Sequence, residues 1–164
     1  MPIRLGSAQL ATRLSDCRIG LVANPASVDT SLQHITNFVS SLPNVRLAAL
    51  FGPQHGFQSD VQDNMIETDH TDHPILGVPI YSLYGEIREP TAEMLTGLDT
   101  LVIDLQDVGT RVYTYIHTMT NCLAACATHN VPVVVCDRPN PVGGVAVEGP
   151  MLKPGFESFV GKFP

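Results

Sequence analysis

The chain has 164 residues, of which 44% are hydrophobic and 15% charged, a composition that favours one globular domain and excludes a disordered protein. Its net charge of −7 and the lack of a Lys/Arg cluster argue against a nucleic-acid partner. No apolar run is long enough to cross a bilayer and the N-terminus lacks the apolar core of a secretory signal, so we expect a cytoplasmic protein with no membrane partner.

The first third of the chain predicts a strand, a helix and a second strand. Residues 17–24 form a short apolar run that ends before Pro25, which predicts a strand followed by a turn. Asp29 is suited to cap a helix with one apolar face, made of Leu32, Ile35, Phe38 and Val39. Residues 46–51 predict the next strand.

A long polar segment, residues 58–73, follows and predicts a loop. Residues 78–84 resemble a strand, but Pro79 indicates an edge strand or a strand start. Residues 91–95 predict a short helix.

The last predicted elements are the most apolar. Residues 100–106 and 131–136 are continuous apolar runs that predict buried strands. Between them, residues 113–129 predict the longest helix, with an apolar stripe of Ile116, Met119, Leu123 and Cys126. We therefore predict an α/β fold, a Rossmann-like layer with a mostly parallel sheet and helices on both faces.

Two absences narrow the chemistry. No G-x-G-x-x-G motif is present, which argues against a dinucleotide, and we expect no cofactor. The four cysteines show no C-x-x-C spacing and are expected to be reduced and buried.

Polar side chains gather where the predicted strands end. Ligands bind at the carboxyl ends of strands in open parallel sheets, so this convergence predicts a binding or active site. The residues are Asn24, Gln54, His55, Asp104, Gln106, Asp107, Asp137, Arg138 and Asn140.

The segment 104–115 carries the densest polar pattern. If the strand continues through it, Asp104 and Gln106 share the face opposite the apolar residues. Arg111 is suited to pair with either aspartate, which would make it a ligand-binding group or a structural pin for the loop. Tyr113 flanks the helix start, where it would stack on a sugar or pack internally.

Two further loops are candidate sites. Residues 137–141 form a proline-braced loop in which Arg138 and Asn140 offer directed donors, either to a ligand or to nearby backbone. Residues 67–73 contain His70, Asp72 and His73, but their spacing matches no zinc pattern, so we expect a solvated loop and no metal.

Several motifs occur together in the order typical of one family. The chain resembles the NamZ family of exo-β-N-acetylmuramidases from about residue 14 to residue 163. The motifs are Asn24-Pro25, Phe51-Gly-Pro-Gln-His-Gly56, Tyr81-Ser-Leu-Tyr-Gly85, Asp104-Leu-Gln-Asp-Val-Gly-Thr-Arg-Val-Tyr-Thr-Tyr115, Asp137-Arg-Pro-Asn-Pro141 and Glu148-Gly-Pro150.

The resemblance implies a cell-wall-recycling glycoside hydrolase that releases terminal β-linked N-acetylmuramic acid from the non-reducing end of peptidoglycan fragments. Its partners would be muropeptides or the MurNAc–GlcNAc disaccharide. Residues 1–164 would form the Rossmann-like N-terminal catalytic domain, without the smaller C-terminal domain that completes the family's active-site cleft.

One position departs from the family pattern. Many family members carry glutamate where this chain has Gln54, and an amide cannot exchange a proton as a carboxylic acid does. Another carboxylate could serve (Asp104, Asp107 or Glu67), or Gln54 could polarise a substrate amide with His55 as the proton carrier, or catalysis could be lost. The last case would leave a non-catalytic muropeptide- or sugar-binding module.

We therefore expect the catalytic residues to be Gln54, His55, Asp104 and Asp107. The expected substrate-binding residues are Asn24, Gln106, Arg111, Tyr113, Arg138 and Asn140, with Arg111 or Arg138 meeting the lactyl carboxylate. A weaker alternative is a metal-dependent hydrolase that uses His55 with the His/Asp cluster near residue 70.

Overall fold

Six strands form a single sheet in the order β3-β4-β2-β1-β5-β6. The computed structural model describes residues 3–61 and 66–162. All neighbouring strands pair in parallel except the short edge strand β3, which is antiparallel to β4. The elements in chain order are η1 (Gly6–Thr12), β1 (Cys17–Val22), α1 (Ile35–Ser41), β2 (Val45–Gly52), β3 (Thr71–Asp72), β4 (Pro79–Ser82), α2 (Ala92–Leu95), β5 (Thr100–Ile103), α3 (Tyr115–His129) and β6 (Val133–Val135).

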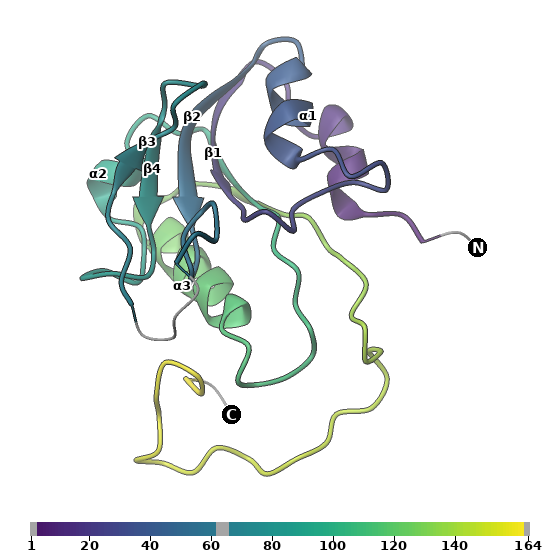
Figure 1. Cartoon of the computed structure of the whole chain (residues 1–164), viewed down its shortest axis with the longest axis vertical. Helices are drawn as coiled ribbons and strands as arrows, with labels where there is room; N and C mark the ends of the chain where they lie inside the picture. Colours follow the sequence, from purple (N-terminus) through teal and green to yellow (C-terminus); the bar gives the residue numbers. More distant parts are fainter. Residues whose placement is uncertain (1–2, 62–65, 163–164) are drawn as a thin grey trace.

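Helices cover both faces of this sheet, as predicted, because alternate strand residues feed two separate cores. Ile19 and Leu21 of β1 pack with η1 and α1, whereas Val22 packs with α2 and α3. Figure 1 shows α1 on one side of the strands and α2 with α3 on the other. Burial of each large aliphatic side chain contributes about 1.5–3 kcal/mol.

The chain order reverses next to β1, and this fixes where a site can form. From β1 the chain adds β2 and β4 on one side of the sheet, then returns to add β5 and β6 on the other. The carboxyl ends of the parallel strands point toward the long C-terminal segment that follows β6 (Figure 1). A crevice at such a reversal is the usual ligand site in open α/β sheets.

Helix α1 begins five residues later than the sequence pattern suggests, after His34 and not after Asp29. Asp29 accepts hydrogen bonds from the backbone of Ser31 and Gln33, so it caps a turn and not the helix. Leu32 has a φ of 61° and is exposed, and His34 is the residue that caps α1 through a bond to Thr36 N.

The predicted stripe of α3 is wrong in part. Ile116 and Leu123 are exposed, although Cys126 is buried and Met119 packs at the edge of the core. The buried face carries polar residues that a hydrophobicity pattern does not pick out, and comprises Tyr115, His117, Thr118, Asn121, Cys122, Ala125 and Cys126. All four cysteines are free, and three of them are buried.

Strand β5 ends at Ile103, earlier than the predicted run to residue 106. The two-residue alternation therefore does not continue through Asp104 and Gln106. Asp104 is fully buried immediately after the strand, whereas Gln106 is half-buried in the following loop.

Candidate active site

The reversal point between β1 and β5 is filled by the protein's own side chains. Arg138 donates from Nε to Asp104 Oδ1 at 2.6 Å and from Nη2 to Asp104 Oδ2 at 2.8 Å, a two-pronged bond across the ends of β5 and β6. The Arg138 side chain is 6% exposed and that of Asp104 0%. Arg138 Nη2 also donates to the Val28 carbonyl. Asp104 therefore pairs with Arg138 and not with Arg111. Arg111 instead donates a hydrogen bond to the carbonyl of Pro150.

Asn24 extends this arrangement to the start of α3. Its Nδ2 donates to the Tyr115 hydroxyl at 2.8 Å, and its backbone N–H donates to Ser27 Oγ. The Ser27 hydroxyl in turn donates to the Asp104 carbonyl. We call Asn24, Ser27, Asp104, Tyr115 and Arg138 the buried network.

Burial shapes the protonation of this region. Desolvation, with a smaller contribution from Tyr113, raises the pKa of Tyr115 to about 12. Desolvation also raises the pKa of the adjacent Cys136 to about 12. The hydrogen bond to Asp104 raises the pKa of Arg138, so that residue stays cationic. Tyr115 and Cys136 therefore stay neutral, and Arg138 stays cationic, at neutral pH.

A tight turn after β2 presents the first pair of predicted catalytic residues. Gly56 N donates to the Pro53 carbonyl, and between them His55 has a φ of 73°, which is uncommon for a residue with a side chain. Gly52 is required before the turn, since a Cβ there would collide with the backbone of Phe57. The turn directs Gln54 and His55 away from the strand end into one cavity.

Each of these two side chains has one internal partner. The Gln54 carbonyl Oε1 accepts a hydrogen bond from Thr114 Oγ1 at 2.7 Å. His55 Nδ1 lies 2.9 Å from the Val61 carbonyl. A carbonyl only accepts, so Nδ1 carries the proton in this contact and Nε2 is the ring nitrogen that can gain or lose one.

The cavity at this position, here called the cleft, has a volume of about 560 Å³, which suits a small ligand. It lies over the carboxyl ends of β2 and β4 and beside the start of α3. Aromatic, amide and hydroxyl groups dominate its lining, and no carboxylate belongs to it among the residues that the structure describes. The lining residues are Gln54, His55, Tyr84, Arg88, Val112, Tyr113, Thr114, Tyr115, Ser158, Phe159 and Val160.

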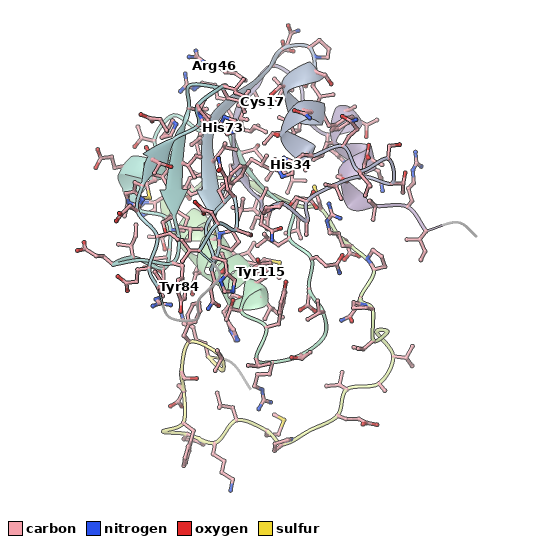
Figure 2. The ribbon with its side chains drawn as sticks, in the orientation of Figure 1. Cys17, His34, Arg46, His73, Tyr84 and Tyr115 are labelled. Atoms are coloured by element: carbon pink, nitrogen blue, oxygen red, sulfur yellow. The ribbon has the colours of Figure 1, made fainter. Side chains whose placement is uncertain are left out.

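Arg88 packs in the cleft wall against two aromatic rings that also contact each other, with their centroids 5.3 Å apart. Its guanidinium carbon lies 4.2 Å from the Tyr84 ring centroid and 4.3 Å from that of Phe159. Phe159 reaches this position because a turn at its flanks pairs Ser158 with Gly161. The contacts of Phe159 with Tyr84 and Arg88 attach the C-terminal segment to the cleft. In Figure 2, Tyr84 and Tyr115 lie near the end of the sheet that faces this segment, opposite Arg46.

The remaining predicted residues lie around the other side of the α3 start. Asp107 Oδ2 accepts from Asn140 Nδ2 at 3.3 Å, and Gln106 Nε2 donates to the carbonyls of Asp107 and Pro139. Asp107 lines two neighbouring cavities, one of about 500 Å³ shared with Arg111 and one of about 220 Å³ shared with Arg138 and Tyr115.

The predicted residues thus separate into three groups. Gln54, His55 and Tyr113 meet in the cleft. Asn24, Asp104 and Arg138 belong to the buried network. The third group lies beside the cavities around Asp107 and comprises Gln106, Asp107, Arg111 and Asn140.

Among the cleft residues that the sequence pattern does not single out, Tyr84, Arg88 and Phe159 contact one another. Tyr84 belongs to a motif whose role the sequence alone does not define. Arg88 and Phe159 are single residues in irregular segments, and no periodicity or spacing indicates their meeting. The sequence feature that could have indicated this part of the cleft is the close spacing of Tyr81, Tyr84 and Arg88.

The histidines near residue 70 have structural contacts. His70 Nδ1 accepts from Ser82 N, and His73 Nδ1 accepts from the backbone of Leu76. Within residues 3–61 and 66–162, no group of three or more His, Cys, Asp or Glu side chains is arranged to hold a metal ion. No helix in that same part of the chain has the length and apolar character needed to span a membrane.

Comparison with known proteins connects this arrangement to a family. The family model for the N-terminal part of exo-β-N-acetylmuramidase NamZ matches residues 19–164. The chain is 47% identical over 152 residues to the peptidoglycan β-N-acetylmuramidase NamZ of Bacillus subtilis (strain 168). That match covers 93% of this chain and 36% of the relative, so the chain spans about a third of the relative's length.

Two solved structures of DUF1343 family proteins from Bacteroides fragilis NCTC 9343 have the same fold. One superposes with a TM-score of 0.87 at 40% identity, covering 99% of this chain and 42% of the other. The second superposes with a TM-score of 0.82 at 30% identity, covering 100% of this chain and 42% of the other.

Proposed function

The chain belongs to the NamZ N-terminal family, and we propose that it forms the sugar-binding and catalytic domain of an exo-β-N-acetylmuramidase. Peptidoglycan fragments ending in β-linked N-acetylmuramic acid are its proposed substrates, in the form of muropeptides or the MurNAc–GlcNAc disaccharide. We further propose that residues 1–164 act together with a smaller C-terminal domain and work in the cytoplasm in cell-wall recycling.

One observation carries this proposal. Gln54 and His55 follow β2 and Tyr113 precedes α3, yet all three line the same cleft. A sugar ring offers both apolar faces and hydroxyl groups, and the cleft supplies aromatic rings beside amide, hydroxyl and imidazole groups.

His55 is the residue we propose as proton carrier. Glycoside cleavage requires a proton on the leaving oxygen and stabilisation of an oxocarbenium-like centre. With Nδ1 held by the Val61 carbonyl, the imidazole ring is oriented and Nε2 is the position that exchanges a proton.

Gln54 has a different proposed role. Its carbonyl is used by Thr114, so the Nε2 amino group is the part that can donate to a ligand. A donor at this position can hold a substrate acetamido or hydroxyl oxygen, but it cannot replace the acid of a two-carboxylate mechanism.

Three carboxylates are candidates for the acid in place of residue 54, and their positions suit that role to different degrees. Asp104 is fully buried and bonded to Arg138, which favours a structural role. Asp107 lines the adjoining cavities and is open to a ligand that extends past Tyr115. Glu67 lies 3.9 Å from Arg88 at the rim of the cleft.

A second function, sugar binding without hydrolysis, rests on Gln54 itself. A cleft whose described lining contains no carboxylate suits recognition as well as catalysis.

Release of N-acetylmuramic acid from an aryl β-N-acetylmuraminide tests the two functions, with the B. subtilis relative as a positive control. Turnover that His55→Asn abolishes supports the glycosidase with a histidine proton carrier. Binding of N-acetylmuramic acid without turnover supports the binding module. A large gain of activity in Gln54→Glu would argue against altered chemistry in this chain, because that change restores the carboxylate common in the family.

A further inference from the structure

We propose that Arg88 is the specificity-determining residue of the cleft and recognises a carboxylate on the ligand. This inference rests on the proposed sugar-binding function of the same cleft and names the feature that the cleft selects. It also moves carboxylate recognition from Arg111 or Arg138 to a residue that the sequence pattern did not single out.

The charge of the cleft is opposite to that of the protein. The chain as a whole carries a net charge of −7. Among the described lining residues, however, Arg88 is a permanent cation and no carboxylate is present. A partly enclosed surface of one sign favours a ligand of the other sign.

Arg88 is positioned for recognition. The rings of Tyr84 and Phe159 lie 4.2 Å and 4.3 Å from its guanidinium carbon and restrict its motion. Its backbone carbonyl accepts a hydrogen bond from Asn121 Nδ2 of α3, which fixes the loop that carries it. A planar guanidinium held in this way loses little conformational freedom when it binds a carboxylate in a two-pronged manner.

Within the part of the chain that the structure describes, Arg88 makes only a weak ion pair. Its ion pair with Glu67 is long, at 3.9 Å, and the two side chains are 35% and 55% exposed. Exposed pairs of this kind contribute little. Arg138 differs, since its Nε and Nη2 are already bonded to Asp104 and the Val28 carbonyl.

The ligand class follows from these contacts. N-Acetylmuramic acid is N-acetylglucosamine with a lactyl ether that ends in a carboxylate. The aromatic and amide groups of the cleft suit the part that both sugars share, whereas Arg88 addresses the carboxylate that only the first carries. Arg88 would therefore discriminate between the two alternating sugars of peptidoglycan.

The test measures binding of three probes by titration calorimetry: N-acetylmuramic acid, N-acetylglucosamine and glucuronic acid. Arg88→Met removes the charge but keeps a chain that can pack against the two rings, and Arg88→Lys keeps the charge without the planar guanidinium. Arg46→Met is the matched control, because Arg46 is exposed in β2 near the opposite end of the sheet (Figure 2). Urea unfolding of each variant checks its fold.

We expect the unmodified protein to prefer N-acetylmuramic acid by at least about tenfold, the range for a hydrogen bond to a charged group. Arg88→Met should weaken that sugar by about 10- to 100-fold and leave N-acetylglucosamine unchanged. Arg88→Lys should recover part of the preference. Glu67→Gln should tighten N-acetylmuramic acid by up to about fivefold, because it removes a competing carboxylate.

Two results overturn the inference. If Arg88→Met keeps the preference for N-acetylmuramic acid, Arg88 does not read the carboxylate, although the proposed function stands. If none of the three probes binds, both proposals fail. Binding of glucuronic acid alone, lost in Arg88→Met, would support carboxylate recognition by Arg88 while the proposed function fails.

Discussion

The buried network and the cleft are made of the same kinds of residue but differ in how their polar groups are used. Both follow the carboxyl ends of parallel strands, and both contain residues that a sequence pattern marks as a site. In the buried network, Asp104 and Arg138 are bonded to each other at 2.6 Å and 2.8 Å. In the cleft, Gln54 and His55 each have one internal bond and face a cavity.

The difference teaches that polar density at strand ends does not by itself mark a site. At the reversal point of this sheet, where ligands commonly bind, the chain has closed the crevice with an internal ion pair. The open cavity lies instead over the neighbouring strands β2 and β4. The buried network supports the cleft, since Tyr115 belongs to both.

Breaking the ion pair should have the largest effect on stability. Asp104→Ala leaves the Arg138 charge buried and unpaired, and Arg138→Met leaves the Asp104 charge buried and unpaired. Each change should lower the free energy of unfolding by about 3–5 kcal/mol. Urea unfolding measures the loss. The double variant Asp104→Leu/Arg138→Met should lose less than the two single losses added together. A loss below about 1 kcal/mol in either single variant would mean that water reaches the pair.

His55→Asn should separate function from stability. Asparagine tolerates the positive φ at this position, so the turn should keep its shape and the unfolding free energy should change little. Removal of the imidazole should lower turnover in the proposed N-acetylmuramidase reaction by about 100-fold or more. His129→Asn, at the exposed end of α3, is the control and should leave turnover unchanged. Full turnover in His55→Asn would exclude His55 as the proton carrier.

Phe159→Ala should loosen the cleft with a modest cost. Loss of the Phe159 contact with Arg88 should remove about 0.5–1 kcal/mol and increase amide hydrogen exchange in residues 156–162. The middle of α3 should keep its protection. Phe156→Ala is the matched control, because Phe156 is exposed in the same segment. Equal exchange in the two variants would show that Phe159 does not anchor the segment.

Alkaline pH should lower the stability of the domain gradually, through the buried Tyr115 and Cys136. The pKa of Tyr115 is raised to about 12 from 10.0, and that of Cys136 to about 12 from 9.0. Both groups are neutral when protonated, so their contribution is fully present below the unfolded-state pKa and is lost as pH rises toward 12. The urea midpoint should therefore fall between pH 9 and pH 12. Tyr115→Phe should show a smaller fall above pH 10, and an equal fall would contradict this assignment.

Much of the fold could be predicted from the sequence because the central strands are continuous apolar runs. The start of α1 could not be predicted, because an aspartate such as Asp29 can cap either a turn or a helix. In the structure it caps a turn, in which Leu32 has a positive φ. The buried face of α3 was misjudged because His117, Thr118 and Asn121 read as surface residues.

The candidate site was predictable only as a set of strand-end residues. That Asp104 pairs with Arg138 depends on β5 and β6 being adjacent, which brings together residues 34 positions apart. The role of Arg88 depends on Phe159, which arrives from a segment without regular structure. Such meetings are properties of the tertiary fold and not of local sequence.

The attachment of Phe159 to the cleft has a consequence for biosynthesis. A ribosome makes Gln54 and His55 early, completes the parallel sheet at β6, and adds Phe159 only afterwards. A nascent chain can therefore form its ion pair and bury both cores while Arg88 rests on Tyr84 alone. The contact between Arg88 and Phe159 would therefore form only after the parallel sheet is complete.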